Sequence, residues 1–90
     1  MKSDLPEVLA ISEVQRLLRE FATARDWGQF HSPKNLAMAL AAESGELLEV
    51  FQWLTEEQSR ELSAGHLSHA SEEIADIQIY LLRLADVLDV

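Results

Sequence analysis

Apolar residues recur at helical spacing along most of this chain, and no segment shows the alternation expected of a strand. The clearest apolar stripe lies in residues 36–54, where it comprises Leu36, Leu40, Leu47, Val50 and Leu54. These residues are three, four or seven positions apart, which places them on one face of a helix. The whole pattern predicts four helices joined by short connections, and therefore an all-α fold.

Capping residues indicate where the first two helices begin. Ser12 and Gln15 have the spacing of a capping box, so the first helix should begin there and fade around residues 26–28. Ser32 followed by Pro33 is a typical helix start, with serine as the N-cap and proline in the first turn. We expect the second helix to extend from there to about residue 54.

The second half of the chain contains the other two predicted helices. Thr55 and Gln58 form another capping box, for a short helix that ends before Gly65. The last helix is expected at about residues 68–88, after a connection with the sequence GHLSH. Its apolar stripe comprises Ala70, Ile74, Ile77, Leu81, Leu84 and Leu88. A second stripe beside it comprises Glu73, Asp76, Tyr80 and Arg83, which also share one face.

Size and composition limit the classes of protein that this chain can belong to. Ninety residues form one domain, 1–90, and so small a chain buries only roughly 60% of its unfolded surface. We therefore expect a partner subunit to complete the core. The net charge of −9 argues against binding a nucleic acid polymer. No apolar run is long enough to span a membrane, and the N-terminus lacks a signal peptide, so the expected location is cytoplasmic.

Acidic pairs on two helices are the main candidate for chemistry. Glu43 interrupts the apolar stripe of the second helix, and Glu46 follows it by three residues. Glu73 and Asp76 have the same spacing on the last helix. Antiparallel packing would bring the pairs together, and four carboxylates would then favour Mg²⁺, Mn²⁺ or Ca²⁺. Ordinary solvated acidic faces are the alternative. Gly45 would allow another helix or a ligand to approach closely.

Other chemistries have weaker support. A di-iron carboxylate bundle needs Glu-x-x-His pairs, which are missing. His66 and His69 are expected to be exposed loop histidines without a suitable third ligand. The chain has no cysteine and no glycine-rich phosphate loop, so neither a cysteine nucleophile nor such a loop is available. The aromatic residues could either line a nucleobase site or fill the core; they are Trp27, Phe30, Trp53 and Tyr80.

The acidic motifs and their surroundings resemble a known family. ESGE at 43–46, followed by EIAD at 73–76, resembles the signature of the MazG-like, all-α nucleoside triphosphate pyrophosphohydrolases. The segment RDWGQFHSPKNLAMALAAESGELLEVFQW, residues 25–53, is similar to the dCTP pyrophosphatase branch of that family. In that branch an F-H-x-P-basic-N segment precedes the first acidic motif and F-Q-W follows it. The resemblance covers about residues 11–88.

This resemblance implies a fold, an activity and a set of site residues. The fold would be four-helix-bundle-like and completed by dimerisation, in a homodimer or homotetramer. The activity would be Mg²⁺-dependent hydrolysis of a nucleoside triphosphate such as dCTP to the monophosphate and pyrophosphate, for nucleotide-pool cleansing, with Mn²⁺ as a substitute ion. The implied metal ligands are Glu43, Glu46, Glu73 and Asp76, with Glu46 favoured as the base. The implied nucleotide contacts are His31, Lys34, Asn35, Trp53 and Tyr80.

The chain departs from this branch at its C-terminus. Related sequences continue past the last helix with a tail containing Lys, Asn and Arg that closes over the nucleotide, whereas this sequence ends at Val90. Either the tail has been lost by truncation, or other groups such as Arg83 or a neighbouring subunit close the site. A non-catalytic acidic module for helical oligomerisation is the alternative function, in which the acids would bind no nucleotide.

Overall fold

The structure is a computed structural model that describes residues 10–90. Its elements in chain order are α1 (Ile11–Ala24), the 3₁₀ turn η2 (Trp27–Gln29), α2 (Pro33–Phe51), α3 (Glu56–Arg60) and α4 (Ala64–Val87). Within these residues there is no strand, so the predicted all-α fold is confirmed. Residues 1–9, which carry the prediction that the N-terminus lacks a signal peptide, lie outside the described part of the chain.

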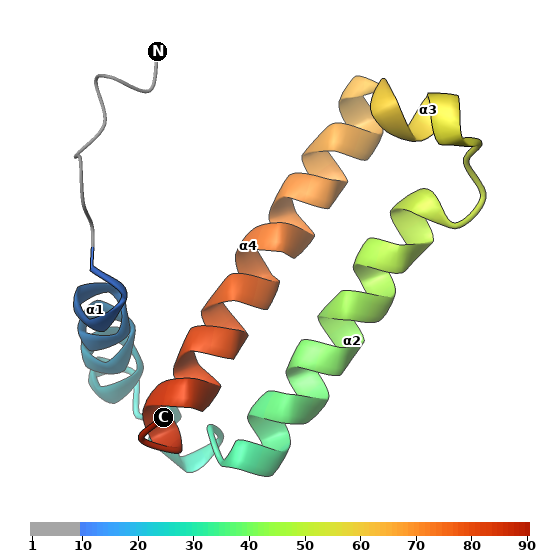
Figure 1. Cartoon of the computed structure of the whole chain (residues 1–90). Coiled ribbons are helices and arrows are strands. Elements are labelled where there is room, and N and C mark those ends of the chain that lie inside the picture. The colour runs from blue at the N-terminus through green and yellow to red at the C-terminus, as the bar shows by residue number, and fades with distance from the viewer. Residues whose placement is uncertain (1–9) are drawn as a thin grey trace.

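Two long antiparallel helices form the centre of the molecule. Figure 1 shows α2 and α4 side by side, with the short α3 joining them at one end and α1 on the other side of α4. The packing side of α2 is the predicted apolar stripe, in which Leu36 and Val50 are buried. Leu36 is only 1% exposed. This antiparallel pair is the frame on which the acidic residues are placed.

The predicted caps of α2 and α3 are confirmed. The Ser32 side chain accepts a hydrogen bond from the Asn35 backbone N–H at 3.1 Å, and Pro33 occupies the first turn. Thr55 and Gln58 make both hydrogen bonds of a capping box. These bonds satisfy N–H groups that a helix leaves free at its start. The end of α2 differs slightly from the prediction, because the helix stops at Phe51.

The predicted start of α1 is wrong. Its N-cap is Ala10, without any side-chain cap, and Ser12 lies inside the helix. The Gln15 side chain instead donates a hydrogen bond to the Leu82 carbonyl oxygen of α4, at 3.2 Å. The Gln15 side-chain amide, which the sequence pattern assigned to a capping box at the start of α1, thus makes a tertiary contact with α4 instead.

The predicted start of α4 is also wrong, by four residues. Ser63 is the N-cap, and its hydroxyl accepts a hydrogen bond from the His66 N–H at 3.2 Å. The GHLSH segment is therefore helical, and Gly65 is accommodated in the first turn. This earlier start adds His66 to α4, and His69 then lies well inside the helix rather than at its entry.

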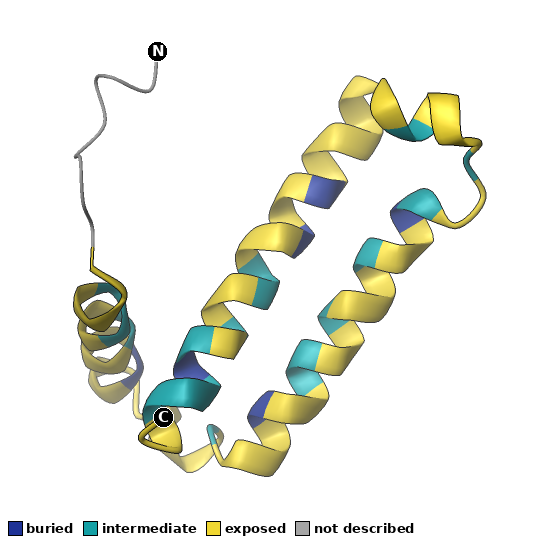
Figure 2. Ribbon diagram, in the orientation of Figure 1, coloured by how far each residue is buried: buried dark blue, intermediate teal, exposed yellow. Residues whose placement is uncertain are grey.

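The buried side of α4 contains only part of the predicted apolar stripe: Ala70 is buried and Ile77 and Leu84 are half-buried. Ile74, Leu81 and Leu88 are each about half exposed, whereas Glu73 and Arg83 of the polar stripe are buried. Figure 2 shows the buried residues of α2 and α4 on the sides that face each other. The helix thus directs its polar stripe toward α2, because the acids of both helices lie in that interface. Part of its apolar stripe remains uncovered in the single chain.

Candidate metal and nucleotide site

Carboxylates from both long helices meet in the interface between α2 and α4. Glu43 comes from α2, and Glu73 and Asp76 come from successive positions on one face of α4. One carboxylate oxygen from each of these three residues lies within 4.8 Å of the other two. The antiparallel packing of the helices therefore brings three of the four predicted ligands into one cluster.

Glu73 is the most constrained member of this cluster. The residue is only 8% exposed, and its Oε2 atom is buried without a hydrogen-bond partner. A buried carboxylate is costly unless a cation or several donors neutralise it. Oxygen ligands of this kind suit a hard divalent cation. The residues present therefore fit a divalent cation held by this cluster.

The neighbouring carboxyl of Glu43 responds to the same crowding. The side-chain interaction with the Glu73 carboxyl raises the pKa of Glu43, burial and the charge of Glu73 raise it further, and the interaction with the Asp76 side chain opposes these effects. A raised pKa means that the ionised form is disfavoured in this position. A bound cation would reverse that preference by neutralising the shared charge.

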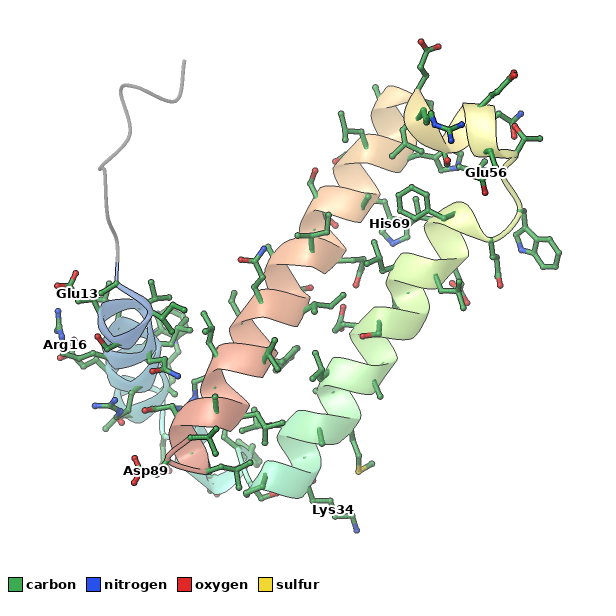
Figure 3. All side chains as sticks on the ribbon, in the orientation of Figure 1. Glu13, Arg16, Lys34, Glu56, His69 and Asp89 are labelled. Carbon is green, nitrogen blue, oxygen red and sulfur yellow. The ribbon has the colours of Figure 1, made fainter. Side chains whose placement is uncertain are left out.

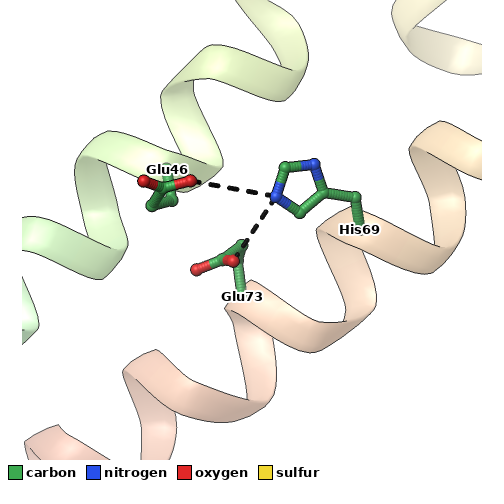
Figure 4. Close-up of side chains that lie close together, drawn as sticks. All are labelled: Glu46, His69 and Glu73. Atoms are coloured by element: carbon green, nitrogen blue, oxygen red, sulfur yellow. Dashed lines mark ion pairs between the residues drawn. The ribbon is translucent and has the colours of Figure 1, made fainter.

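The fourth acid, Glu46, lies in a second cluster with His69 and Glu73. The His69 Nε2 atom is 3.5 Å from the Glu73 Oε1 atom and 4.0 Å from the Glu46 Oε2 atom. Figure 4 shows the three side chains converging from α2 and α4. The prediction that His69 is a loop histidine without a third ligand is therefore wrong. The four-residue spacing of His69 and Glu73, which places both side chains on one face of a helix, was the signal that could have found this cluster.

Gly45 lies between the two α2 acids, and no other helix of the described chain contacts it closely. It is exposed, and nothing lies within 4 Å of the position that a Cβ atom would occupy. The expectation that another helix approaches here is wrong for the described chain, because α2 directs Glu43, rather than Gly45, toward α4.

His31 lies at the end of the α2–α4 pair that is far from α3, beside the buried Arg83. Its Nδ1 atom accepts a hydrogen bond from the Arg83 Nε atom at 3.3 Å. Burial and the charge of Arg83 lower the pKa of His31, which favours the neutral imidazole. Asp86 accepts a second, longer bond from Arg83 at 3.4 Å. His31 is thus a fixed part of a polar network.

The other predicted nucleotide contacts are spread along the molecule. Lys34 is exposed in the first turn of α2, and the Asn35 side chain donates a hydrogen bond to the Phe30 carbonyl oxygen at 3.1 Å. Trp53 is 85% exposed just beyond the other end of α2, while Tyr80 is half-buried one turn after Asp76. Figure 3 shows Lys34 far from His69. A single chain therefore does not gather all of these residues around the acids.

The chain is similar in structure and sequence to known pyrophosphatases. No family model matches it. It resembles a pyrophosphatase from Archaeoglobus fulgidus DSM 4304 with a TM-score of 0.82 and 40% identity, over 94% of this chain and 80% of that one. It is 46% identical to dCTP pyrophosphatase 1 of Bos taurus and 44% identical to that of Homo sapiens, each over 83% of this chain.

This chain belongs to the MazG-like, all-α family of pyrophosphatases. It spans about half the length of the curated relatives that it matches, 46% of the bovine protein and 45% of the human one. In the part of the chain that the structure describes, no helix is long and apolar enough to cross a membrane.

This MazG-like chain also has an apolar groove that the sequence pattern did not indicate. The groove lies between α1, η2 and α4 and is lined by Leu17, Leu18, Phe21, Ala22, Trp27, His31 and Ile79. Trp27 packs edge-on against Phe21, with ring centroids 5.4 Å apart. Trp27, Phe30 and Trp53 all remain exposed, so the interpretation of these aromatic residues as core fillers is wrong.

Proposed function

We propose that this chain hydrolyses a nucleoside triphosphate between its α and β phosphates, with Mg²⁺ as the cofactor and dCTP as the expected substrate. The observation that carries the proposal is the buried, unpartnered Glu73 carboxylate, clustered with Glu43 and Asp76. Without a cation these charges are unfavourable in the interface. The names of the related proteins, dCTP pyrophosphatase 1 and a pyrophosphatase, support this choice of substrate and bond.

In this proposal each acidic residue has a stated role. Glu43, Glu73 and Asp76 hold the ion, and the half-exposed Glu46 at the edge of the cluster accepts the proton of the attacking water. When bound, Mg²⁺ neutralises phosphate oxygens and makes water a better nucleophile. The exposed side chain of Glu46 can reach a solvent molecule, which suits it to the task of a base. No protein nucleophile is required.

The proposed nucleotide contacts need a second subunit. Lys34 would contact phosphates, His31 and Asn35 would border the substrate, and Trp53 and Tyr80 would contact the base or sugar. Trp53 lies ten residues beyond Glu43, which is about 15 Å along an α-helix. A homodimer or homotetramer would bring the ends of one chain close to the acids of another. The half-exposed apolar residues of α4 support such an assembly.

The direct test is a panel of nucleoside triphosphates with Mg²⁺, assayed for released pyrophosphate. We expect dCTP to be hydrolysed, and Glu73→Gln and Asp76→Asn to lower turnover by about 100-fold or more while the helical content is unchanged. Glu72→Gln is the matched control, since Glu72 is exposed on the same helix, and it should retain activity. An active Asp76→Asn protein would refute the site.

The alternative, a non-catalytic oligomerisation module, gives a different result in the same panel. Such a module releases no pyrophosphate from any triphosphate. In calorimetry with a non-hydrolysable dCTP analogue, it shows no heat that depends on Mg²⁺. Either result alone contradicts the hydrolase, whereas metal-dependent heat together with turnover excludes the module.

A further inference from the structure

His69 gives the acidic interface a nitrogen ligand in addition to its oxygen ligands. It lies one helical turn before Glu73 on α4, and across the interface from Glu46 on α2. We infer that Glu46, His69 and Glu73 form a second cation site, for a divalent transition-metal ion such as Zn²⁺ or Co²⁺. This site shares the Glu73 carboxylate with the proposed Mg²⁺ site but differs from it in donor chemistry and does not depend on hydrolysis.

The distances between the three side chains suit a metal ion. Ligand atoms about 2.0–2.1 Å from a tetrahedral metal ion lie about 3.3 Å from one another. Here the His69 Nε2 atom is 3.5 Å from the Glu73 Oε1 atom and 4.0 Å from the Glu46 Oε2 atom. Small side-chain rotations close these gaps. The Glu46 and His69 side chains are 52% and 46% exposed, so both can rotate and an ion can enter from solvent.

The buried carboxylate of Glu73, which belongs to both clusters, is the sign beyond the cluster itself that this site takes a cation. Its side chain is 10% exposed, its Oε1 atom faces His69, and its Oε2 atom is buried without a hydrogen-bond partner. An imidazolium at residue 69 would supply one positive charge for two carboxylates. A divalent ion matches both charges and also engages the imidazole nitrogen.

The donor set determines which ion is expected. An all-oxygen cluster such as Glu43, Glu73 and Asp76 suits Mg²⁺, whereas an imidazole nitrogen shifts the preference toward Zn²⁺, Co²⁺ and similar ions. Three protein ligands leave a further coordination position open. Since Glu73 belongs to both clusters, its carboxylate is placed to contact two ions at once.

The test is a Zn²⁺ titration of the metal-stripped protein by calorimetry, with Mg²⁺ held in excess. We expect one Zn²⁺ site per chain, and a loss of affinity of more than about 100-fold in His69→Gln, because even outer partners of metal ligands are worth 10- to 100-fold. His66→Gln is the matched control. That residue lies one turn earlier on α4, with its Nδ1 atom 3.1 Å from the Ser63 hydroxyl, and outside the cluster.

Imidazole NMR signals provide a second readout, because the chain has only three histidines. We expect Zn²⁺ to shift the His69 signals and to leave those of His66 unchanged. No Zn²⁺ binding to the unaltered protein, equal affinity in His69→Gln, or equal losses in both variants would overturn the inference. Pyrophosphate release with Mg²⁺ is assayed separately. A failed Zn²⁺ site with intact hydrolysis leaves the proposed function standing, and the reverse result leaves the second site standing.

Discussion

The carboxyl group of Glu73 links the energetics of this interface to its chemistry. It is buried between α2 and α4, and one of its oxygens lacks a hydrogen-bond partner. The pKa of the neighbouring Glu43 is raised, chiefly by the interaction of its side chain with the Glu73 carboxyl. In the absence of metal the interface therefore contains an electrostatic conflict. Stability and ion binding should be coupled at these residues.

The first prediction concerns Glu43→Gln in metal-free protein. A carboxyl whose folded-state pKa is raised stabilises the fold below its unfolded pKa and loses that contribution as pH rises through the folded pKa. Glutamine at this position stays neutral as pH rises, so the variant does not lose this contribution to stability. We therefore expect the melting temperature of the variant to exceed that of the unaltered protein at pH 7, and the two to converge near pH 4. Calorimetric scans at both pH values measure this difference.

Added Mg²⁺ provides the counter-test for the same variant. The ion should raise the melting temperature of the unaltered protein and have a smaller effect on Glu43→Gln, because one ligand is missing. If Mg²⁺ stabilised both proteins equally, Glu43 would not be a ligand.

At the scale of the helices, caps and tertiary contacts compete for the same residues. Ser32 and Thr55 cap the helices that they precede, as local pattern predicts. Gln15 was expected to complete a cap but is bonded to α4, and Ser63 begins α4 where a connection was expected. The position of that cap matters for function, since the extra turn it begins carries His66 and leads into His69.

The second prediction tests the start of α4. Ser63→Ala removes the N-cap and should lower the free energy of unfolding by about 1 kcal/mol. Ser68→Ala is the control, because residue 68 is exposed inside the helix and alanine is a better helix former there. Chemical denaturation measures both. A larger loss in Ser68→Ala than in Ser63→Ala would place the helix start at residue 68.

The third prediction concerns the attachment of α1 to α4. Asp86 accepts two hydrogen bonds from Arg19, both at 2.9 Å, and also contacts the buried Arg83. Asp86→Asn leaves Arg83 without its carboxylate partner, and we expect a loss of about 3 kcal/mol in the free energy of unfolding at pH 7. Asp89→Asn is the control. It lies beyond α4 with a positive φ of 57°, which asparagine tolerates.

The same substitution should show a characteristic pH dependence. The hydrogen bonds from Arg19 lower the pKa of Asp86 in the folded protein. A lowered pKa contributes stability above the unfolded value, near 4, which is lost as pH falls through the folded value. The gap between the unaltered protein and Asp86→Asn should therefore narrow below about pH 4. A gap that stays constant down to pH 2 would contradict this assignment.

At the scale of the whole molecule, the single chain leaves much of its apolar surface uncovered. Its buried apolar residues are few, namely Ala22, Leu36, Val50 and Ala70 among those described. Half-exposed residues such as Ile74 and Leu81 lie on α4, and Met38 and Leu48 are exposed on α2. Apolar patches of this kind are typical of interfaces between subunits.

The fourth prediction is therefore a homo-oligomer in solution. Light scattering should give a mass of two or four times the 10.1 kDa of one chain. Leu81→Glu places a charge on the uncovered face and should shift the population toward the monomer, since a charge is costly to bury. A monomer at all concentrations for the unaltered protein would contradict the proposed assembly and the shared nucleotide site.

Local patterns in the chain were sufficient for the fold class and for the acidic pairs. Helical spacing of apolar residues, and the caps at Ser32 and Thr55, depend on contacts within a few residues, so they are readable in sequence. The spacing of Glu43 and Glu46, and of Glu73 and Asp76, likewise defines one face on each helix. The acidic pairs of the two helices come together because α2 and α4 pack antiparallel, which a short connection favours.

Contacts between distant residues decided the rest. Which face of α4 is buried depends on α2 and on α1, and the buried face combines Ala70 of the apolar stripe with Glu73 and Arg83 of the polar stripe. The partner of Gln15 is 67 residues away, and no local signal reveals it. His69 lies beside Glu46 as well as Glu73 because α2 and α4 pack against each other. Long-range packing overrides local preference in such cases, because burial and hydrogen bonding are determined by the neighbours that folding brings together.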